Sequence, residues 1–285
     1  MATTALLGTG LLGSGFALKM LERGEDLVVW NRTPDKTAPL VQAGARAAAT
    51  PADAVADADR VHLVLAEDSA VDAVLSQALP ALPQGAWVID HSTNAPALVA
   101  ERTARLRAEG VRYVHAPVFM SPRDARNATG LMLLSASDED AAVLTPILEQ
   151  MTGRLWHVGE RADLAAVHKI SGNGMLIALA GTMGDLFAIA QARGLPPDAV
   201  IALFDVFRAG GAIPFIGKRV VAAPDMDTSF ALTMARKDVR LMIDAAGGPD
   251  DLVVLPGLAA AMDKAIEAGL GDKDFAVFAW PGREQ

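Results

Sequence analysis

The first half of the chain alternates short apolar runs with segments in which apolar residues recur at helical spacing. The apolar runs are TALLGTG (4–10), DLVVWNR (26–32), RVHLVLAED (60–68), AWVIDHST (86–93), VRYVHAPV (111–118) and LMLLSAS (131–137). The helical segments between them include GFALKMLERG (15–24), SAVDAVLSQALPAL (69–82) and APALVAERTARLRAEG (95–110). Strands that alternate with helices in this way predict βαβ units and a mainly parallel, doubly wound α/β sheet.

The second half shows no strand signal after RLWHVGE (154–160) and follows a helical pattern nearly to its end. We therefore predict an α/β domain over residues 1–160 and an all-α domain over residues 161–285, joined by a long helix. A site is expected in the groove that the two domains share. The most apolar stretch, residues 170–190, contains Asn173, Asp185 and several glycines, which predicts a buried helix rather than a membrane span.

Composition and charge exclude several classes of protein. The 285 residues are 52% hydrophobic and 21% charged, as in ordinary globular proteins. A net charge of −9 without a basic run argues against nucleic-acid binding. The chain has no cysteine and its five histidines lack metal-ligand spacing, so neither a disulfide nor a metal site is expected. The opening MATTALLGTG lacks the basic segment of a signal peptide, so we expect a cytoplasmic protein without a membrane partner.

A glycine motif, Gly8-Thr9-Gly10-Leu11-Leu12-Gly13, follows the first apolar run and opens the first helical segment. Gly8 would allow a tight turn, Gly10 would let the backbone approach a pyrophosphate, and Gly13 would let the helix pack on the strand. The helix N-terminus would present free N–H groups to the phosphates. All six residues are therefore expected at a dinucleotide in a Rossmann domain; the alternative is a merely tight strand-to-helix turn.

The second apolar run ends in Asn31-Arg32-Thr33, where an NAD-selective site usually has a carboxylate for the ribose 2′-hydroxyl. Arg32 can pair with a 2′-phosphate and stack on the adenine, while Asn31 and Thr33 can donate hydrogen bonds. The residues predict NADP(H) as the cofactor, with Leu65 and Ala66 beside it at the end of the third run. The alternative is that Arg32 is a solvated loop cation.

The segment HKISGNG (168–174) places Lys169 and Asn173 four residues apart, on one face of a predicted helix. Because Gly172 and Gly174 have no side chains, a substrate could approach the helix closely at that face. A carbonyl that accepts hydride needs a proton donor at its oxygen, and an ammonium group can supply it. The alternative is an ordinary solvated helix lysine.

Over essentially its full length the chain resembles the β-hydroxyacid dehydrogenase family, which includes 3-hydroxyisobutyrate dehydrogenases and the glyoxylate/succinic semialdehyde and tartronate semialdehyde reductases. The resemblance rests on the glycine motif, DHST (90–93), APV (116–118), KISGN (169–173) and RKD (236–238). It implies an NADP-dependent enzyme of the EC 1.1.1 type that transfers hydride between nicotinamide and a hydroxy acid or semialdehyde. It also implies a homodimer formed through the helical domain, which is similar to the C-terminal domain of 6-phosphogluconate dehydrogenase but much smaller.

The resemblance also implies roles for individual residues. Lys169 would be the general acid/base, and Asn173 would position the substrate. Ser92 would contact a substrate carboxylate, Thr93 would lie near both substrate and nicotinamide, and Lys237 would reach the cofactor from the second domain. Asp185 stands where the family usually has Glu, which suggests a structural role.

Two departures from the family pattern bear on the substrate. Where the family continues APV with Ser-Gly-Gly, a loop whose backbone binds the acid, this chain has Phe119-Met120-Ser121-Pro122. Phe119, Met120 and Ser121 are therefore expected to line or narrow the pocket. Gly172 replaces a second asparagine before Asn173. Both changes leave open an acceptor that is larger or less polar than a small hydroxy acid.

Two other functions remain open from the sequence. Imine reductases share the architecture and the preference for NADPH, but the ammonium of Lys169 would repel an iminium cation. A non-catalytic NADP-binding protein is the second alternative, and the presence of both Lys169 and Asn173 argues against it.

Overall fold

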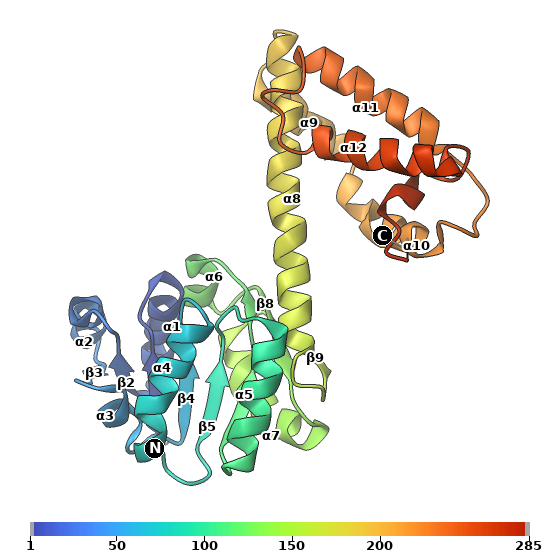
Figure 1. The fold of residues 1–285 in the computed structure, drawn as a ribbon. Coiled ribbons are helices and arrows are strands. Elements are labelled where there is room, and N and C mark those ends of the chain that lie inside the picture. Colours follow the sequence, from blue (N-terminus) through green and yellow to red (C-terminus); the bar gives the residue numbers. More distant parts are fainter. Residues whose placement is uncertain (1–2, 283–285) are drawn as a thin grey trace. The chain divides into compact units, whose positions relative to one another are not determined.

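The computed structural model describes residues 3–282. The chain divides into two compact units, residues 1–173 and 174–285. The division falls within the long helix α8 (Leu164–Ala192), beyond the boundary near residue 160 that the loss of strand signals suggests (Figure 1).

The first unit is built on a sheet whose strands are, in chain order, β1 (Thr3–Leu7), β2 (Asp26–Trp30), β3 (Arg46–Ala47), β4 (Arg60–Leu63), β5 (Trp87–Asp90), β6 (Arg112–His115), β7 (Val118–Phe119), β8 (Leu131–Ser135) and β9 (Arg154–Gly159). Within residues 3–282 they form one nine-stranded sheet in the order β3-β2-β1-β4-β5-β6-β8-β7, with β9 paired to β8. The order reverses direction between β1 and β4, next to the glycine motif. In open α/β sheets ligands bind at this switch point.

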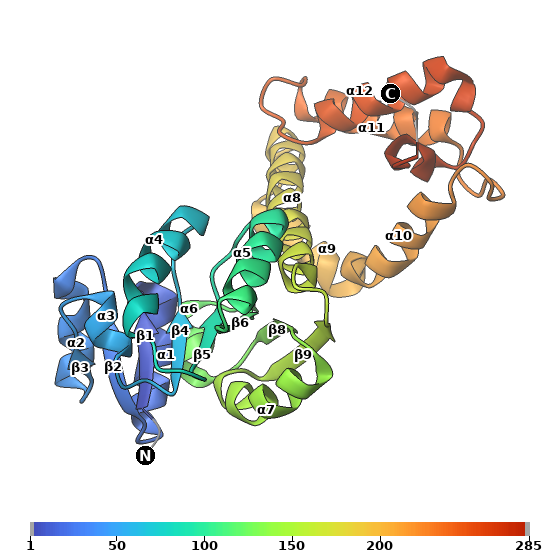
Figure 2. The same ribbon diagram turned by 60° about the horizontal axis from the view of Figure 1, so that its bottom comes forward.

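Helices cover both faces of the sheet, as Figures 1 and 2 show. They are α1 (Leu11–Glu22), α2 (Ala38–Gln42), α3 (Pro51–Val55), α4 (Asp68–Ala78), α5 (Pro96–Ala108), α6 (Pro122–Asn127) and α7 (Asp138–Leu148). Successive residues of β1 belong to different cores: Leu6 packs with Phe16 of α1, whereas Leu7 packs with Leu75 of α4. This alternation follows from the two-residue period of a strand, and it confirms the doubly wound fold.

The sheet is mainly parallel, as predicted, but its far end is not. β8 runs antiparallel to both β6 and β7. Apolar runs look alike in parallel and antiparallel strands, so the sequence pattern could not show this reversal. The two-residue strands β3 and β7 were not predicted either, because two residues carry no periodicity.

The second unit is helical throughout its described part, which confirms the prediction for the second half of the chain. After α8 come α9 (Pro197–Val206), α10 (Ile213–Ala222), α11 (Leu232–Ala246) and α12 (Leu255–Ala265). The core of this unit joins α11 and α12 through Leu232, Val239, Leu255 and Met262.

The prediction that residues 170–190 form a buried helix is wrong in one respect. The helix is present, but only 11% of its most apolar 18-residue window is buried. By length and composition α8 could cross a membrane, as could the bent pair Pro197–Val206 and Ala209–Ala222 if counted as one span; core helices of soluble proteins pass the same test. A helix with apolar residues on all sides is expected to be buried, but its sequence does not show whether the rest of the same chain or another surface buries it.

Candidate active site

The glycine motif forms the turn from β1 into α1, and its glycines have different functions. Gly8 has a φ of +106°, and a Cβ there would lie 2.2 Å from the carbonyl oxygen of Val64. A Cβ at Gly13 would lie 1.9 Å from the carbonyl oxygen of Gly8. A Cβ at Gly10 would meet no atom of the described chain within 4 Å. Gly8 and Gly13 are thus required by the fold, whereas Gly10 leaves space open at the N-terminus of α1, where a dinucleotide phosphate can approach.

Asn31 ties this turn to the end of β2. Its Oδ1 accepts a hydrogen bond from the N–H of Thr9 at 3.0 Å, and its Nδ2 donates to the carbonyl oxygen of Thr33 at 3.0 Å. Thr9 is buried, and its hydroxyl donates to the carbonyl oxygen of Lys36. The structure therefore gives Thr9 and Asn31 a part in shaping the loop. One of the two Nδ2 hydrogens of Asn31 is used in this way, and its predicted hydrogen bond to the cofactor stays a prediction.

A cavity of about 430 Å³ opens beside this loop. It brings together six of the predicted cofactor residues: Gly10, Asn31, Arg32, Thr33, Leu65 and Ala66. Its remaining lining includes Lys36, Glu67 and the apolar residues Val64 and Val74. The two cations can bind phosphate, the free space at Gly10 lets a phosphate approach the backbone, and the apolar walls can hold an adenine ring. The lining thus suits the phosphate-bearing adenosine half of a dinucleotide.

Not every predicted cofactor residue lines this cavity. Leu12 packs against the core, and Leu11 is 81% exposed at the start of α1. Lys36 is the lining residue that sequence analysis missed. It lies in the 3₁₀ turn Pro34–Thr37, four positions after Arg32, and that spacing from an already suspected cation was the available signal.

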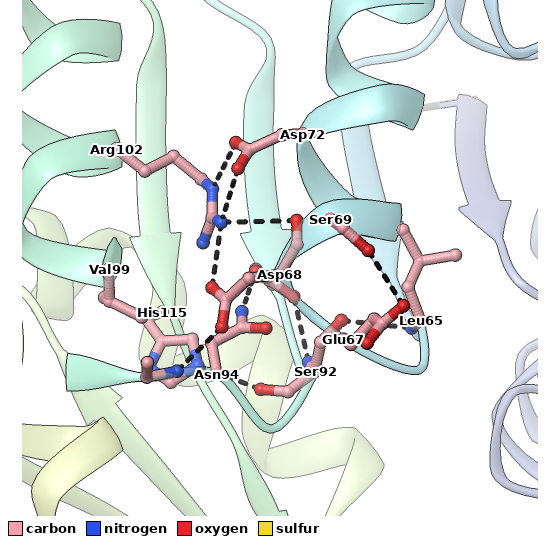
Figure 3. A network of polar contacts seen from close by, with 12 residues as sticks. Leu65, Glu67, Asp68, Ser69, Asp72, Ser92, Asn94, Val99, Arg102 and His115 are labelled. Atoms are coloured by element: carbon pink, nitrogen blue, oxygen red, sulfur yellow. Dashed lines mark hydrogen bonds and ion pairs between the residues drawn. The ribbon is translucent and has the colours of Figure 1, made fainter. Parts of the chain in front are cut away.

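The loop after β5 is fixed by the buried carboxylate of Asp90. That carboxylate accepts hydrogen bonds from the N–H of Ser92 (2.8 Å), the Nδ2 of Asn94 (2.7 Å) and the hydroxyl of Tyr113 (2.8 Å). The hydroxyl oxygen of Ser92 accepts the N–H of Leu65 at 3.0 Å, which joins this loop to the cavity wall (Figure 3). Ser92 is only 2% exposed, whereas Thr93 is exposed. Of the two substrate contacts predicted in this loop, Thr93 is the accessible one.

Arg102 of α5 holds the same region from outside. Its guanidinium is buried and bridges the carboxylates of Asp72 and Asp68, which come from α4 (Figure 3). Hydrogen bonding to Arg102 lowers the pKa of Asp72. Asp68 also accepts the N–H of Ala95 at 2.9 Å. Arg102 therefore joins α5 to α4, the helix that lines the cavity, and the bond from Ala95 to Asp68 ties the loop that carries Ser92 and Thr93 to the same helix.

Buried histidines hold the loop after β5 in place. The Nδ1 of His91 donates to the carbonyl oxygen of Ala116 at 2.7 Å, and its Nε2 lies 2.9 Å from the Nδ1 of His62. Burial lowers the pKa of His91 to about 4, so the ring is neutral at neutral pH. Since both nitrogens are engaged within the protein, His91 positions the loop and is not available to a substrate.

Lys169 and Asn173 meet on α8 as predicted. The Nζ of Lys169 donates to the Oδ1 of Asn173 at 3.0 Å and lies 4.3 Å from the centroid of the Phe119 ring. Burial lowers the pKa of Lys169. The structure therefore brings three predicted residues together around one half-buried ammonium.

The neighbours of Phe119 behave differently. Met120 is partly buried and packs against a hydrophobic core of the first unit. Ser121 is the N-cap of α6: both its N–H and its hydroxyl donate to the Oδ2 of Asp124, and its oxygen accepts the N–H of Asp124. This capping box uses the donors of Ser121 within the chain.

Two further residues lie in the second unit. Lys237 of α11 is exposed, with its Nζ 3.0 Å from the Oδ1 of Asp238, and its contact with the cofactor stays a prediction. Asp185 is buried and accepts the N–H groups of Val253, Val254 and Leu255 at the start of α12, in keeping with the structural role suggested for it.

Comparison with known proteins gives this arrangement a family. Residues 3–159 match the NAD binding domain of 6-phosphogluconate dehydrogenase. Over 284 residues the chain is 30% identical to 3-sulfolactaldehyde reductase of Escherichia coli (strain K12), spanning 97% of this chain and 94% of that protein. The chain belongs to the β-hydroxyacid dehydrogenase family.

Other members of the β-hydroxyacid dehydrogenase family are similar along the whole chain. Glyoxylate/succinic semialdehyde reductase 1 of Arabidopsis thaliana is 27% identical, spanning 95% of this chain and 94% of that one. Among solved structures, the imine reductase from Myxococcus stipitatus in complex with NADP+ has a TM-score of 0.85 and 25% identity, spanning 97% of this chain and 98% of that one. This β-hydroxyacid dehydrogenase family member is thus a nicotinamide-binding oxidoreductase of the hydroxyacid and semialdehyde reductase kind.

Proposed function

We propose that the protein is an NADP(H)-dependent reductase of a semialdehyde or related carbonyl compound, with Lys169 as general acid/base. The observation that carries the proposal is the half-buried Lys169–Asn173 pair, with Nζ and Oδ1 3.0 Å apart, in a chain that also has a cavity whose lining suits the adenosine half of a dinucleotide. The bound nicotinamide would supply or accept the hydride.

Lys169 would act on the carbonyl oxygen. As negative charge develops there, the ammonium would stabilise it and deliver the proton; in the reverse direction the neutral amine would take the proton from the alcohol. Burial lowers the pKa of Lys169 and so favours the neutral amine that the reverse direction needs. Asn173 accepts one N–H of the ammonium, which leaves its other hydrogens to point at a substrate.

The preference for NADPH over NADH rests on Arg32 and Lys36, which line the same cavity. Two cations at the end of β2 can pair with a 2′-phosphate, while NADH offers only a hydroxyl there.

The proposal is tested by following NADPH oxidation with a panel of aldehydes, keto acids and cyclic imines. Lys169→Ala is expected to reduce kcat at least about a hundredfold while NADPH affinity stays within twofold. Lys264→Ala, an exposed lysine of α12, is the matched control and should keep full activity. Comparable rates for Lys169→Ala and the parent protein would remove Lys169 from the mechanism.

Imine reduction is the second candidate, and the likeness to the imine reductase from Myxococcus stipitatus supports it. The positive charge of Lys169 counts against it, because an iminium cation beside the ammonium would be repelled. Rates with cyclic imines that exceed those with all carbonyl compounds would favour this candidate.

We also propose a homodimer in which a second copy covers the helical unit. Within that unit Ile177 is 72% exposed and Val206 is 87% exposed, and Leu176, Leu203 and Phe207 are exposed as well. Exposed apolar side chains in such number are typical of an interface between subunits. Light scattering after gel filtration tests the proposal, and a monomer at micromolar concentration would contradict it.

A further inference from the structure

Phe119 and Gly172 fit together beside Lys169. A Cβ at position 172 would lie 2.3 Å from the Cζ of Phe119 and 2.7 Å from its Cε1. No real side chain approaches so closely, so the ring can occupy this place only because residue 172 is glycine. The two departures from the family pattern, Phe119 and Gly172, thus depend on each other sterically.

The ring also covers the ammonium of Lys169. With Nζ 4.3 Å from the ring centroid, the pair is within the range of a cation–π interaction. Asn173 holds another side of the same ammonium through its 3.0 Å hydrogen bond. A carbonyl oxygen that takes its proton from Nζ would therefore bring its substituents next to an aromatic face.

The loop that follows Phe119 is poorly suited to hold a carboxylate. The N–H and hydroxyl of Ser121 are both donated to Asp124, at 2.9 and 2.6 Å, and Pro122 has no N–H. Asp124 adds a negative charge to the loop, and hydrogen bonding to Ser121 lowers its pKa, which keeps it ionised. Arg123 lies close enough to offset part of this charge, since it also lowers the pKa of Asp124.

This loop is held in place from behind. A Cβ at Gly15 of α1 would lie 2.8 Å from the carbonyl oxygen of Pro122 and 2.9 Å from the Cβ of Ala125. Such close packing of α6 on α1 leaves little room for the loop to turn its backbone toward a ligand. The capping box of Ser121 and Asp124 is therefore a fixed feature.

We propose that Phe119, accommodated by Gly172, is a specificity-determining residue that selects acceptors with an apolar substituent and disfavours those with a carboxylate in the same place. The inference rests on the proposed carbonyl reduction at Lys169. A carboxylate placed against the ring would lose water without gaining a hydrogen-bond donor from the ring or from Ser121 and Pro122 of the following loop, whereas an isopropyl group would gain apolar contact.

The experiment compares two pairs of aldehydes that differ only by an isopropyl group in place of a carboxylate. They are 4-methylpentanal against succinic semialdehyde, and 2-methylpropanal against glyoxylate. The parent protein is expected to favour the neutral member of each pair at least about tenfold in kcat/KM. Equal values, or a preference for the anion, would overturn the proposal.

Three variants distinguish an effect of the Phe119 ring on specificity from a general effect on folding. Phe119→Leu keeps an apolar wall and should keep the preference for neutral acceptors. Gly172→Asn alone collides with the ring and should slow both members of a pair alike. In the double variant Phe119→Ser with Gly172→Asn the smaller serine leaves room for the asparagine, and both side chains can donate hydrogen bonds. The ratio of kcat/KM for the anionic aldehyde to that for the neutral one should therefore rise at least about tenfold. An unchanged ratio in the double variant would contradict the proposal.

A measurement without turnover keeps this inference distinct from the proposed reaction. Primary amides are not reduced by NADPH, yet their carbonyl can accept a hydrogen bond from Lys169. In the presence of NADP+, 4-methylpentanamide is expected to bind the parent protein at least about tenfold tighter than succinamate, by titration calorimetry. If no carbonyl compound is reduced, the proposed function fails, but this comparison still decides the inference: equal or tighter binding of succinamate would overturn it.

Discussion

The carboxylate of Asp185, in the C-terminal half of α8, accepts the backbone N–H of Leu255 at 2.8 Å, 70 residues further along the chain. Val253 and Val254 donate to the same carboxylate at 2.6 and 2.9 Å. The first N–H groups of a helix have no partners within the helix, and Val254, the N-cap of α12, has no side-chain oxygen to offer them. Asp185 therefore caps α12 from another helix.

Replacing this cap should destabilise the second unit. Asp185→Asn retains the shape but loses the charge, and we expect a loss of about 2 kcal/mol in the free energy of unfolding; Asp185→Ala leaves three donors unpaired and should lose about 3 kcal/mol or more. Urea denaturation followed by circular dichroism measures both. The exposed Asp250→Asn is the control and should change stability by less than about 0.5 kcal/mol.

The same carboxylate gives a pH dependence. Burial raises its pKa, but the three N–H donors outweigh burial and hold the pKa below the ordinary value for aspartate. The contribution to stability is therefore complete above the unfolded-state pKa and is lost as the pH falls through the lower folded-state pKa. Equal stability of Asp185→Asn and the parent protein at pH 7 would contradict this role for the carboxylate.

These contacts mark the limit of what the sequence could predict. The glycine motif and the strand runs are local patterns, and local chemistry fixes the turn at Gly8 and the alternation of Leu6 and Leu7. The cap at Asp185 and the Phe119–Gly172 fit join residues more than 50 positions apart, and no spacing rule relates them. The wrong prediction of burial for α8 has the same origin, because an apolar pattern does not identify the surface that covers it.

Glycines of one motif should respond differently to the same substitution. Gly10→Ala puts a methyl group into space that no described protein atom occupies, so stability should change by less than about 0.5 kcal/mol. The methyl group would meet the dinucleotide phosphates instead, and NADPH affinity should fall at least about tenfold. Gly8→Ala clashes with the carbonyl of Val64 at a φ of +106° and should cost about 3 kcal/mol of stability.

Thermal unfolding and NADPH fluorescence titration of the two variants give both readouts. The expected pattern is a folded Gly10→Ala that binds weakly, beside a Gly8→Ala with a lowered melting temperature. Unimpaired NADPH binding by Gly10→Ala would place the cofactor elsewhere than at the N-terminus of α1.

Cofactor preference should depend on Arg32. Arg32→Ala removes a guanidinium from the wall of the cavity, and a charge-assisted hydrogen bond is worth about 1.5–3 kcal/mol. The KM for NADPH should therefore rise roughly tenfold to a hundredfold, while the KM for NADH, which has no 2′-phosphate, stays within twofold. Arg46→Ala, an exposed arginine paired with Asp26, is the control. A parallel rise for both cofactors would show that Arg32 does not read the 2′-phosphate.

Because of its buried histidines, the folded protein should lose stability at pH values higher than those at which carboxylates titrate. Burial lowers the pKa of His91 to about 4, and that of His62 and His115 below the ordinary value as well. Because the unfolded state binds these protons first, stability is complete above the unfolded-state pKa of about 6.5 and falls as the pH drops toward 4.

For His91 alone the shift corresponds to about 3 kcal/mol once the pH reaches 4. Urea denaturation at pH 7, 6 and 5 should therefore show a steady loss of stability in the parent protein and a shallower loss in His91→Gln, which cannot be protonated. His168→Gln changes an exposed ring and should keep the steep dependence of the parent. If His91→Gln were as acid-sensitive as the parent, His91 would titrate alike in the folded and unfolded chain, and burial could not be what lowers its pKa.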